Sequence, residues 1–399
     1  MNKANDLDIR FVVYKIKLVV INIQKKIIIS IILAVTLIGC ISIYFMRRNE
    51  QTPKEEAMYH FPVENQKHAA TWLTWPHPYT YGKKYFQSIE PVWIEMVKAL
   101  APSEKVKIVA YDTDWQKHIE EQLASEHISL DNVEFLIAKT DDVWIRDTGP
   151  IFAYDQKGKR VILDFFFDGW GEKAPYNHDN QLPIKAAKKE KTSLVTIDDF
   201  VLEGGSVELS EDGTLLATKS SVISKNRNPG MTQKEAEGYL RKYLGAKRFI
   251  WLEGVTDEDI TDAHIDGFAR FYDANTLLTV YEDDFLELYE KILPEDYEKL
   301  TNSTNAAGDK YEIIEIPMTK NNVKGLSYKG SYLNYYIANE VILLPVYNDS
   351  NDEVAINIMK ELYQDKQIVP IDVSKLYKNG GMIHCVTQQE IFDEQHNNK

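Results

Sequence analysis

The sequence predicts an α/β domain that begins at about residue 60 and follows a separate apolar segment near the N-terminus. Apolar runs rich in Val, Ile, Leu and Phe, typical of strands, alternate with stretches whose apolar residues recur every three or four positions, typical of one helix face. The 399-residue chain is also 44% hydrophobic and 27% charged. This composition can build a core and excludes a disordered or collagen-like chain.

The first element along the chain is residues 27–46 (IIISIILAVTLIGCISIYFM), a run of twenty residues without a charge. As a helix rising about 1.5 Å per residue, it would span a hydrocarbon core of roughly 30 Å. Ser30, Thr36 and Ser42 are too few to form the polar stripe of a soluble helix. We therefore expect an N-terminal transmembrane helix that acts as a signal anchor.

Flanking charges predict the orientation of this segment. Residues 1–26 form a basic segment with more Lys and Arg than the stretch directly after the apolar run, where Arg47 and Arg48 stand. The positive-inside rule then places the N-terminus inside the cell and the rest of the chain in an extracytoplasmic position. Residues 47–59 are mostly polar and contain Pro53, as expected of a short linker.

A lipoprotein signal is the alternative for the same segment. Leu37, Ile38, Gly39 and Cys40 resemble a bacterial lipobox, in which Cys40 would be lipidated after cleavage. Six more uncharged residues follow Cys40, five of them apolar, whereas the mature start of a lipoprotein is usually polar. The uncleaved anchor is therefore favoured, and both alternatives tether the remaining chain to a membrane.

Strands are predicted where short apolar runs carry β-branched and aromatic residues. In chain order they are residues 105–111, 133–138, 160–167, 214–218, 248–252, 276–281, 311–317 and 340–347. No linker rich in Pro, Gly or Ser interrupts the chain between residues 60 and 390, and no internal sequence repeat is evident. We expect a single domain over residues 60–399.

Helices are predicted at 91–101, 232–245 and 353–363, because each stretch has an apolar face with i, i+3, i+4 spacing. The second of them carries the clearest end signals. Thr232 and Glu235 have the spacing of a capping box, and Gly245 suits the residue that ends a helix.

Charge and cysteine content narrow the function. The chain has 46 basic and 61 acidic residues, of which residues 1–50 hold eight and three, so residues 51–399 carry a net charge of −20. An acidic body repels phosphate backbones, which excludes nucleic acid as a partner and favours small cations or cationic side chains. Two cysteines are too few for a disulfide scaffold.

Five polar or glycine-rich clusters stand where core strands end, and burying such groups is costly unless they are used. They are residues 141–150, 165–173, 202–209, 261–271 and 379–388. In the first, an Arg146–Asp147 ion pair and a turn would explain most residues but not Asp141 and Asp142. In the third, Glu203 precedes a Gly pair that suits either a hairpin turn or a close approach to a ligand.

The last two clusters hold the candidate acid/base and nucleophilic groups. His264 and Asp266 would face the same side of a strand. They could be metal ligands, but a metal site needs further partners, and a buried histidine bonded to a carboxylate is a structural alternative. Cys385, the only cysteine after residue 46, follows a Gly pair and suits either buried packing or a nucleophile.

Motifs for nucleotide cofactors are absent, since neither GxGxxG nor GxxxxGK[ST] occurs. A thiol, an imidazole and several carboxylates remain, in a body without a predicted cofactor or metal. The chemistry that fits them is attack by a thiolate on a carbon in a cationic group, with carboxylates binding the positive charge.

The motifs, taken in order, resemble those of the agmatine deiminases and the related Porphyromonas-type peptidylarginine deiminases. They are TWLTWPH (71–77), DDVWIRDTGP (141–150), FFFDGWGEK (165–173), LEGGSVE (202–208), KNRNPGMTQKEAEGYLRKYLG (225–245), DAHIDGFARF (262–271) and GGMIHCVTQ (380–388). The resemblance covers about residues 60–390. It implies the pentein fold, a five-bladed α/β propeller whose active site lies on the central axis.

The resemblance also implies roles for five residues. Cys385 is the nucleophile, His264 and Glu203 form the acid/base pair, and Asp142 and Asp266 bind the guanidinium. Three neighbouring positions depart from the family pattern, in which Ala263 is commonly Gly and Asp141 and Asp168 are commonly Asn.

The implied activity is the hydrolysis of agmatine to N-carbamoylputrescine and ammonia, as in putrescine metabolism. Agmatine is favoured over peptidyl arginine because no pair of arginines that could receive a substrate carboxylate is evident near the motifs. A protein-arginine deiminase, an inactive guanidinium-binding module and, less favoured, a metal hydrolase are the alternatives.

Overall fold

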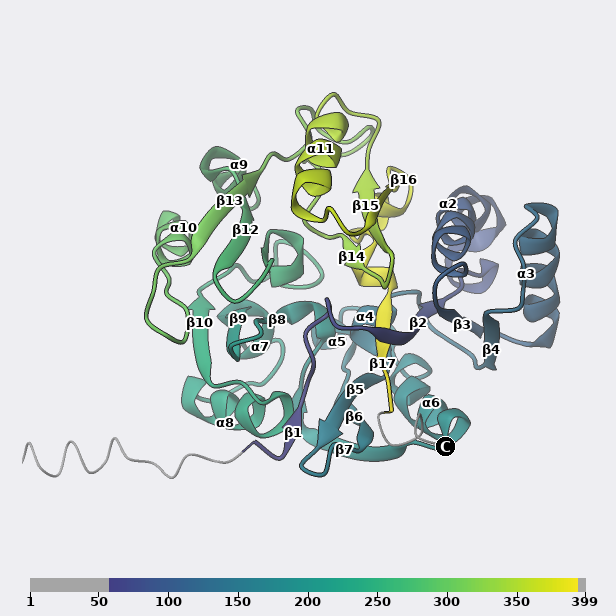
Figure 1. Ribbon diagram of the computed structural model, residues 1–399, viewed down its shortest axis with the longest axis horizontal. Coiled ribbons are helices and arrows are strands. Elements are labelled where there is room, and N and C mark those ends of the chain that lie inside the picture. Colours follow the sequence, from purple (N-terminus) through teal and green to yellow (C-terminus); the bar gives the residue numbers. More distant parts are fainter. Residues whose placement is uncertain (1–56, 394–399) are drawn as a thin grey trace, which may run out of the picture. The chain divides into compact units, whose positions relative to one another are not determined.

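A computed structural model describes residues 57–393 of the chain (Figure 1). The predicted basic segment (1–26), the predicted membrane anchor (27–46), Cys40 and most of the predicted linker lie outside the described residues. Within residues 57–393, none of the helices combines the length and the apolar character needed to cross a bilayer.

Five sheets, all built on one unit, make up the described domain. In each unit a first strand pairs antiparallel with a second, a helix follows, and a third strand pairs parallel with the second. This order of elements confirms the predicted α/β class. The repeat was not evident in the sequence.

The units follow one another along the chain. The first contains β17 (Gln388–Ile391), β2 (His68–Thr74), α2 (Pro78–Leu100), β3 (Lys105–Ala110), α3 (Thr113–Ser125) and β4 (Val133–Ile137). The second contains β5 (Ile151–Asp155), β6 (Arg160–Phe166), α6 (Leu182–Glu190) and β7 (Ser193–Val201), with β1 (Tyr59–His60) at its edge. The third contains β8 (Val207–Leu209), β9 (Thr214–Thr218), α8 (Gln233–Leu244) and β10 (Arg248–Leu252).

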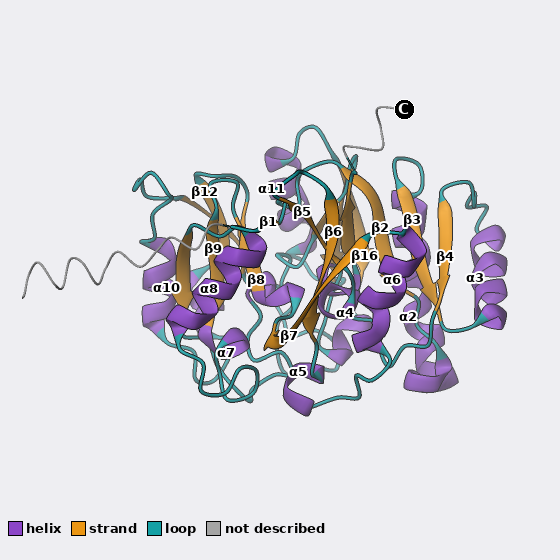
Figure 2. Ribbon diagram, turned by 90° about the horizontal axis from the view of Figure 1, so that it is seen from below, coloured by secondary structure: helices purple, strands orange, loops and turns teal. Residues whose placement is uncertain are grey.

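The fourth unit contains β11 (Ala269–Phe271), β12 (Thr276–Val280), α10 (Pro294–Thr301) and β13 (Glu312–Ile316). The fifth contains β14 (Tyr336–Ile337), β15 (Val341–Val346), α11 (Asp352–Leu362) and β16 (Gln367–Asp372). In Figure 1 the longer helices α3, α8, α10 and α11 lie towards the periphery of this domain, and Figure 2 shows the short helices α5 (Gly169–Glu172) and α7 (Lys219–Val222) among loops at one end of the strands.

The second strand of each unit explains why the apolar runs were easy to find. Every residue of β9 and β12 is buried, as are five of the six residues of β15. Strands buried on both faces have nearly continuous apolar sequences rather than alternating ones. All eight predicted strands are present, with ends that differ by at most one residue.

Helix predictions are confirmed at α8 and α11, whereas α2 begins earlier than predicted. Thr232 and Glu235 form both bonds of the capping box, and Gly245 ends α8 in the left-handed conformation with φ of 76°. Phe86 and Ile89 already lie on the buried face of α2. Pro91 stands inside the helix, so the predicted start at residue 91 was wrong.

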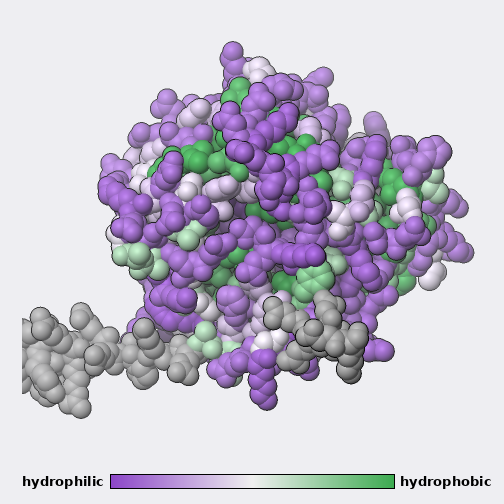
Figure 3. All heavy atoms as spheres, in the orientation of Figure 1, coloured by the Kyte–Doolittle hydropathy of each residue, from purple (hydrophilic) through white to green (hydrophobic). Residues whose placement is uncertain are grey.

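Charged and polar side chains cover most of the face in Figure 3. The largest buried side chains include Trp72, Trp75 and Trp93, together with a group of tyrosines near the fifth unit. The apolar residues therefore serve the core, and the acidic residues are left for the surface and for the site described below.

Candidate active site

The candidate residues lie in five loops, and each loop precedes the first strand of a unit. Asp147 lies four residues before β5, Glu203 four before β8, Asp266 three before β11, Asn334 two before β14 and Cys385 three before β17. Short helical turns in these loops pack together, with α4 (Ile145–Thr148) against η2 (Gly204–Ser206) and η5 (His384–Val386), and η2 against η3 (Ile265–Gly267). The repeat thus brings distant segments to one place.

His264 is the buried imidazole of the site. Its Nε2 atom lies 3.0 Å from Glu203 Oε2, and its Nδ1 atom lies 3.9 Å from Asp147 Oδ2. Burial opposes the charged form, but Asp147, Glu203 and Asp266 outweigh it and raise the pKa of His264 to about 9. His264 is therefore an imidazolium at neutral pH and can donate a proton.

Glu203 is held from behind by an arginine. The Nε atom of Arg227 lies 2.7 Å from Oε1 and 2.9 Å from Oε2 of Glu203, and its NH1 atom lies 2.9 Å from Asp262. The side chains of all three residues are fully buried. This chain of charge-assisted bonds fixes the carboxylate that faces His264.

Gly205 provides the space in which the acidic groups meet His264. A Cβ atom at this position would lie 2.6 Å from His264 Nδ1 and 3.1 Å from Asp147 Oδ1 and Asp266 Oδ2. The Gly205 N–H also donates to Asp147. The glycine pair after Glu203 therefore serves close approach, one of the two interpretations left open for it.

Cys385 lies in the turn that leads into β17. Asn334 Oδ1 is 3.4 Å from both its Sγ and its backbone nitrogen. Burial raises the pKa of the Cys385 thiol well above its usual value, and the negative charges of Asp266 and Asp147 add to this effect. These surroundings therefore hold Cys385 as a thiol.

Asp266 is paired with a second histidine, His384, whose Nδ1 atom lies 2.7 Å from Asp266 Oδ2. Burial alone would raise the pKa of Asp266, but the hydrogen bond and the charge of His384 lower it below its usual value. His264 precedes the 3₁₀ turn η3 and Asp266 lies within it, so the prediction that they share one face of a strand was wrong.

Asp142 lies in the loop before α4 and makes no hydrogen bond to the other four candidates within the described chain. Its carboxylate accepts hydrogen bonds from the Tyr81 hydroxyl and the Val143 N–H. Burial raises the pKa of Asp142 to about 6, against these bonds and one from the Trp144 side chain. Among residues 57–393, no basic side chain forms a salt bridge with this carboxylate.

Trp144 connects Asp142 to the loop of the thiol. A Cβ atom on Gly381 would lie 2.2 Å from the six-membered ring of Trp144. Gly381 belongs to the glycine pair four and five residues before Cys385. The absence of a side chain at Gly381 therefore leaves room for the ring of Trp144, which also bonds the carboxylate of Asp142.

The structure brings together Cys385, His264, Glu203 and Asp266, with Asp142 joined through Trp144. The predicted Arg146–Asp147 ion pair was wrong, because Arg146 bonds Glu64 at 3.1 Å while Asp147 accepts from Trp170 and Gly205. Sequence reasoning missed Asp147 and Asn334. Asp147 shares its cluster with Asp142, but nothing near Asn334 pointed to a site.

The three departures from the family pattern fit locally. Ala263 has φ of 64°, a left-handed conformation that favours the glycine common at this position in the family. Asp141 accepts the His178 N–H and Asp168 accepts the Gly171 N–H, bonds that the oxygen of an asparagine also accepts.

The arrangement suits a cationic carbon centre. Within residues 57–393, no group of three or more His, Cys, Asp or Glu side chains has the placement needed to hold a metal ion. The buried carboxylates Asp147 and Asp266 act electrostatically on both the Cys385 thiol and the His264 imidazolium, and Glu203 bonds the imidazolium. Such a site defines a protein that binds a positively charged group next to a nucleophile and a proton donor.

Comparison with known proteins agrees with this class. The sequence model of the Porphyromonas-type peptidyl-arginine deiminase family matches residues 60–390, and the chain belongs to this family. The structure resembles an agmatine deiminase of Enterococcus faecalis with a TM-score of 0.75 and 26% identity, over 85% of this chain and 97% of the other. It resembles the agmatine deiminase of C. jejuni with substrate bound with a TM-score of 0.73 and 28% identity, over 84% and 97%.

Proposed function

We propose that this protein is an agmatine deiminase, which hydrolyses the guanidinium of agmatine to N-carbamoylputrescine and ammonia. The observation that carries the proposal is the convergence of Cys385, the His264 imidazolium and Asp266 in one buried acidic site. Solved relatives named agmatine deiminases, which align over 97% of their own length, support the same activity.

The reaction begins when the substrate cation enters between Asp266 and Asp142, which bind its nitrogens through charge-assisted hydrogen bonds. The positive charge offsets the carboxylates that hold Cys385 as a thiol, so the thiol releases its proton to solvent water more readily. The thiolate then attacks the guanidinium carbon and forms a C–S bond, which gives a tetrahedral adduct.

Proton transfers by His264 complete the cycle. The imidazolium protonates one amino nitrogen of the adduct, and ammonia departs to leave a thiouronium on Cys385. The neutral imidazole, oriented by Glu203, takes a proton from water as the oxygen attacks the same carbon. Cleavage of the C–S bond releases the ureido product and returns the thiolate.

Agmatine is favoured over arginine because the cations near the site are already engaged. Arg227 is bonded to Glu203 and Asp262, and Arg146 and Arg270 are both bonded to Glu64. Each of these guanidiniums is therefore already bonded to a carboxylate of the protein and is not free to bind the carboxylate of a substrate. Agmatine has no carboxylate and needs no such guanidinium.

The test incubates the purified full-length chain separately with agmatine, free arginine and an arginine-containing peptide, and measures ammonia and the ureido product. We expect turnover of agmatine and none by the Cys385→Ala variant. Turnover of the peptide alone would favour the protein-arginine deiminase. Agmatine binding without turnover by the wild type would favour an inactive binding module.

The five sheets are proposed to be the blades of a pentein propeller, with the catalytic loops at its axis. Support comes from the common unit of all five sheets and from the position of one site loop before each first strand. A crystal structure in which the five units are not related by successive rotations about one axis would contradict this proposal.

An extracytoplasmic site, tethered through residues 27–46, is also proposed. The apolar run and the basic residues before it support this topology. External protease added to intact cells is expected to cleave within residues 47–59 and release the catalytic domain. Protection of the chain in intact cells, with cleavage after lysis, would contradict it, and labelled palmitate on wild type but not on Cys40→Ala would favour the lipoprotein.

A further inference from the structure

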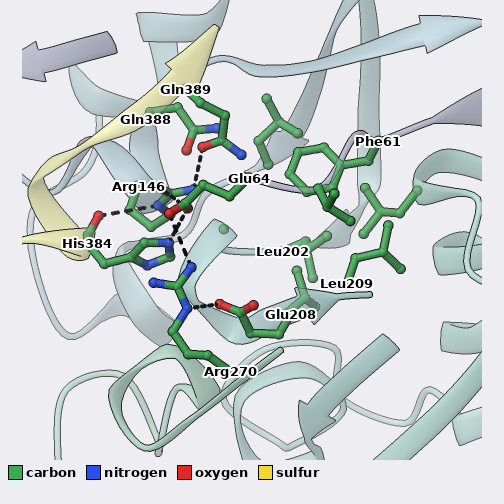
Figure 4. Close-up of a pocket in the computed structure, with 15 residues that line it drawn as sticks. Phe61, Glu64, Arg146, Leu202, Glu208, Leu209, Arg270, His384, Gln388 and Gln389 are labelled. Carbon is green, nitrogen blue, oxygen red and sulfur yellow. Dashed lines mark hydrogen bonds and ion pairs between the residues drawn. The ribbon is translucent and has the colours of Figure 1, made fainter. Parts of the chain in front are cut away.

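Behind the site, a buried carboxylate connects the first described segment of the chain to the catalytic loops. Glu64 lies four residues before β2, and its Oε2 atom is 2.7 Å from His384 Nε2 and 3.1 Å from Arg146 NH2. Its Oε1 atom is 3.2 Å from Arg270 NH2 and accepts the Ile337 N–H at 2.9 Å. Figure 4 shows Glu64 at the centre of these contacts, among the residues that line a pocket.

His384 therefore lies between two carboxylates. Its Nε2 atom faces Glu64 and its Nδ1 atom faces Asp266, both at 2.7 Å. An ionised carboxylate only accepts hydrogen bonds, so both ring nitrogens must carry a proton to make the two bonds. The geometry requires an imidazolium at this position.

We propose that Glu64 is a positioning residue of the active site, which keeps His384 doubly protonated and thereby holds Asp266 ionised and correctly oriented for the substrate guanidinium. The inference rests on the proposed function, because it assigns Asp266 to the substrate. It adds a residue that no sequence motif singled out and that does not reach the substrate itself.

The charges around the two bonds explain why Glu64 is needed. Without it, the Nε2 atom of His384 would have no carboxylate to bond and would face the guanidiniums of Arg146 and Arg270. Arg270, His384 and Arg146 overcome the effect of burial and hold the pKa of Glu64 well below its usual range, so its charge persists. The ionisable groups facing Asp266 and Glu64 are His264, His384, Asp147, Glu208, Arg146 and Arg270.

Glu208 offers a matched control. It is also a buried carboxylate of this cluster and lies 2.8 Å from Arg270 Nε, but it makes no hydrogen bond to His384. Glu64→Gln and Glu208→Gln each remove one buried negative charge beside Arg270 and preserve side-chain size. Only Glu64→Gln breaks the link to Asp266.

The experiment measures agmatine affinity of the full-length Cys385→Ala chain by calorimetry from pH 4.5 to 8, so that the result does not depend on turnover. In this parent, affinity is expected to fall tenfold per pH unit below about 6, as Asp142 takes up a proton. Adding Glu64→Gln should weaken binding about tenfold to a hundredfold at pH 7.5 and make the acid limb steeper, because Asp266 then takes up a second proton. Adding Glu208→Gln should leave the slope unchanged.

Other results would overturn the inference. A Glu64→Gln chain that folds and keeps the affinity and slope of its parent contradicts it, as does an equal change in Glu208→Gln. If Glu64→Gln does not fold, His384→Gln makes the same test, since its amide can donate to Asp266 but carries no charge; an unchanged slope again contradicts the inference. Absence of agmatine binding by the Cys385→Ala parent would also contradict the inference. Binding by the parent without turnover by the wild type would contradict the proposed function alone.

Discussion

The two carboxylates proposed to bind the guanidinium are held in different ways. Asp266 lies 2.7 Å from His384, and the charge of this histidine lowers its pKa despite burial. Asp142 has only hydroxyl, amide and indole donors, and burial raises its pKa to about 6. One side of the site is therefore charged permanently by the protein, whereas the other becomes fully charged only above about pH 6 or when a cation arrives.

This difference predicts that the two carboxylates contribute unequally. Asp266→Asn removes one of the two carboxylates that bond His384, and we expect kcat/KM for agmatine to fall about 10²- to 10³-fold at pH 8. Asp142→Asn leaves no cation unpaired and should cost about ten- to a hundredfold. Steady-state kinetics on both variants tests the order, with thermal melting to check folding. An equal or larger loss in Asp142→Asn would contradict the comparison.

The pH profile should report both sides of the site. Below about pH 6 Asp142 takes up a proton and loses the charge that attracts the guanidinium, and above about pH 9 His264 loses the proton that ammonia needs. We expect kcat/KM to lose a further factor of ten per pH unit beyond each limit, in addition to its rise with pH as the Cys385 thiol ionises. In Asp142→Asn the acid limb near 6 should disappear. A limb that remains there would assign it to another group.

The reactivity of the Cys385 thiol should depend on the nearby carboxylate of Asp147. The negative charge of Asp147 adds to burial in raising the pKa of Cys385, so Asp147→Asn lowers it and increases the thiolate fraction. Alkylation by iodoacetamide at pH 8 should become about threefold to tenfold faster, followed by mass spectrometry of the Cys385 peptide. Glu208→Gln is the control with an unchanged rate. A slower reaction in Asp147→Asn would reverse the assigned sign.

The smallest effect is expected from loss of the hydrogen bond that Tyr81 donates to Asp142. Tyr81→Phe removes the hydroxyl that donates to Asp142, and this bond lowers the pKa of the carboxyl. The acid limb should therefore move to higher pH, with kcat/KM reduced about threefold to tenfold at pH 6 and little changed at pH 8. Tyr85→Phe is a suitable control, because the Tyr85 hydroxyl donates to the Lys375 carbonyl instead. An acid limb at unchanged pH would show that Tyr81 does not set this ionisation.

The strands that could be predicted from the sequence are those whose own residues form a recognisable apolar pattern. The second strands of the units, such as β9 and β15, are buried on both faces and so appear as continuous apolar runs. The first strands β11 and β14 have three and two residues and escaped prediction, because so short a segment has no periodicity. Without the first strands, the repeated unit could not be recognised.

The same limit applies to the site. Cys385, His264, Glu203, Asp142 and Asp266 stand in clusters that are polar or glycine-rich where core would be expected, and this conflict made them visible. Asn334 follows Tyr332 and Leu333 in an otherwise ordinary stretch, and Glu64 lies in a polar segment typical of a surface loop. Their roles depend on contacts with residues far away in the chain.

The sequence by itself determined the α/β class and the family and predicted the nucleophile and its acid/base partner, since each depends on residue types at fixed spacing. Only the tertiary structure decided how each carboxylate is charged. Glu64 and His384 are 320 positions apart, and Asp266 and His384 are 118 apart. A pKa follows from burial and from the charges within a few ångströms, and these neighbours are assembled only when the five units bring their loops together.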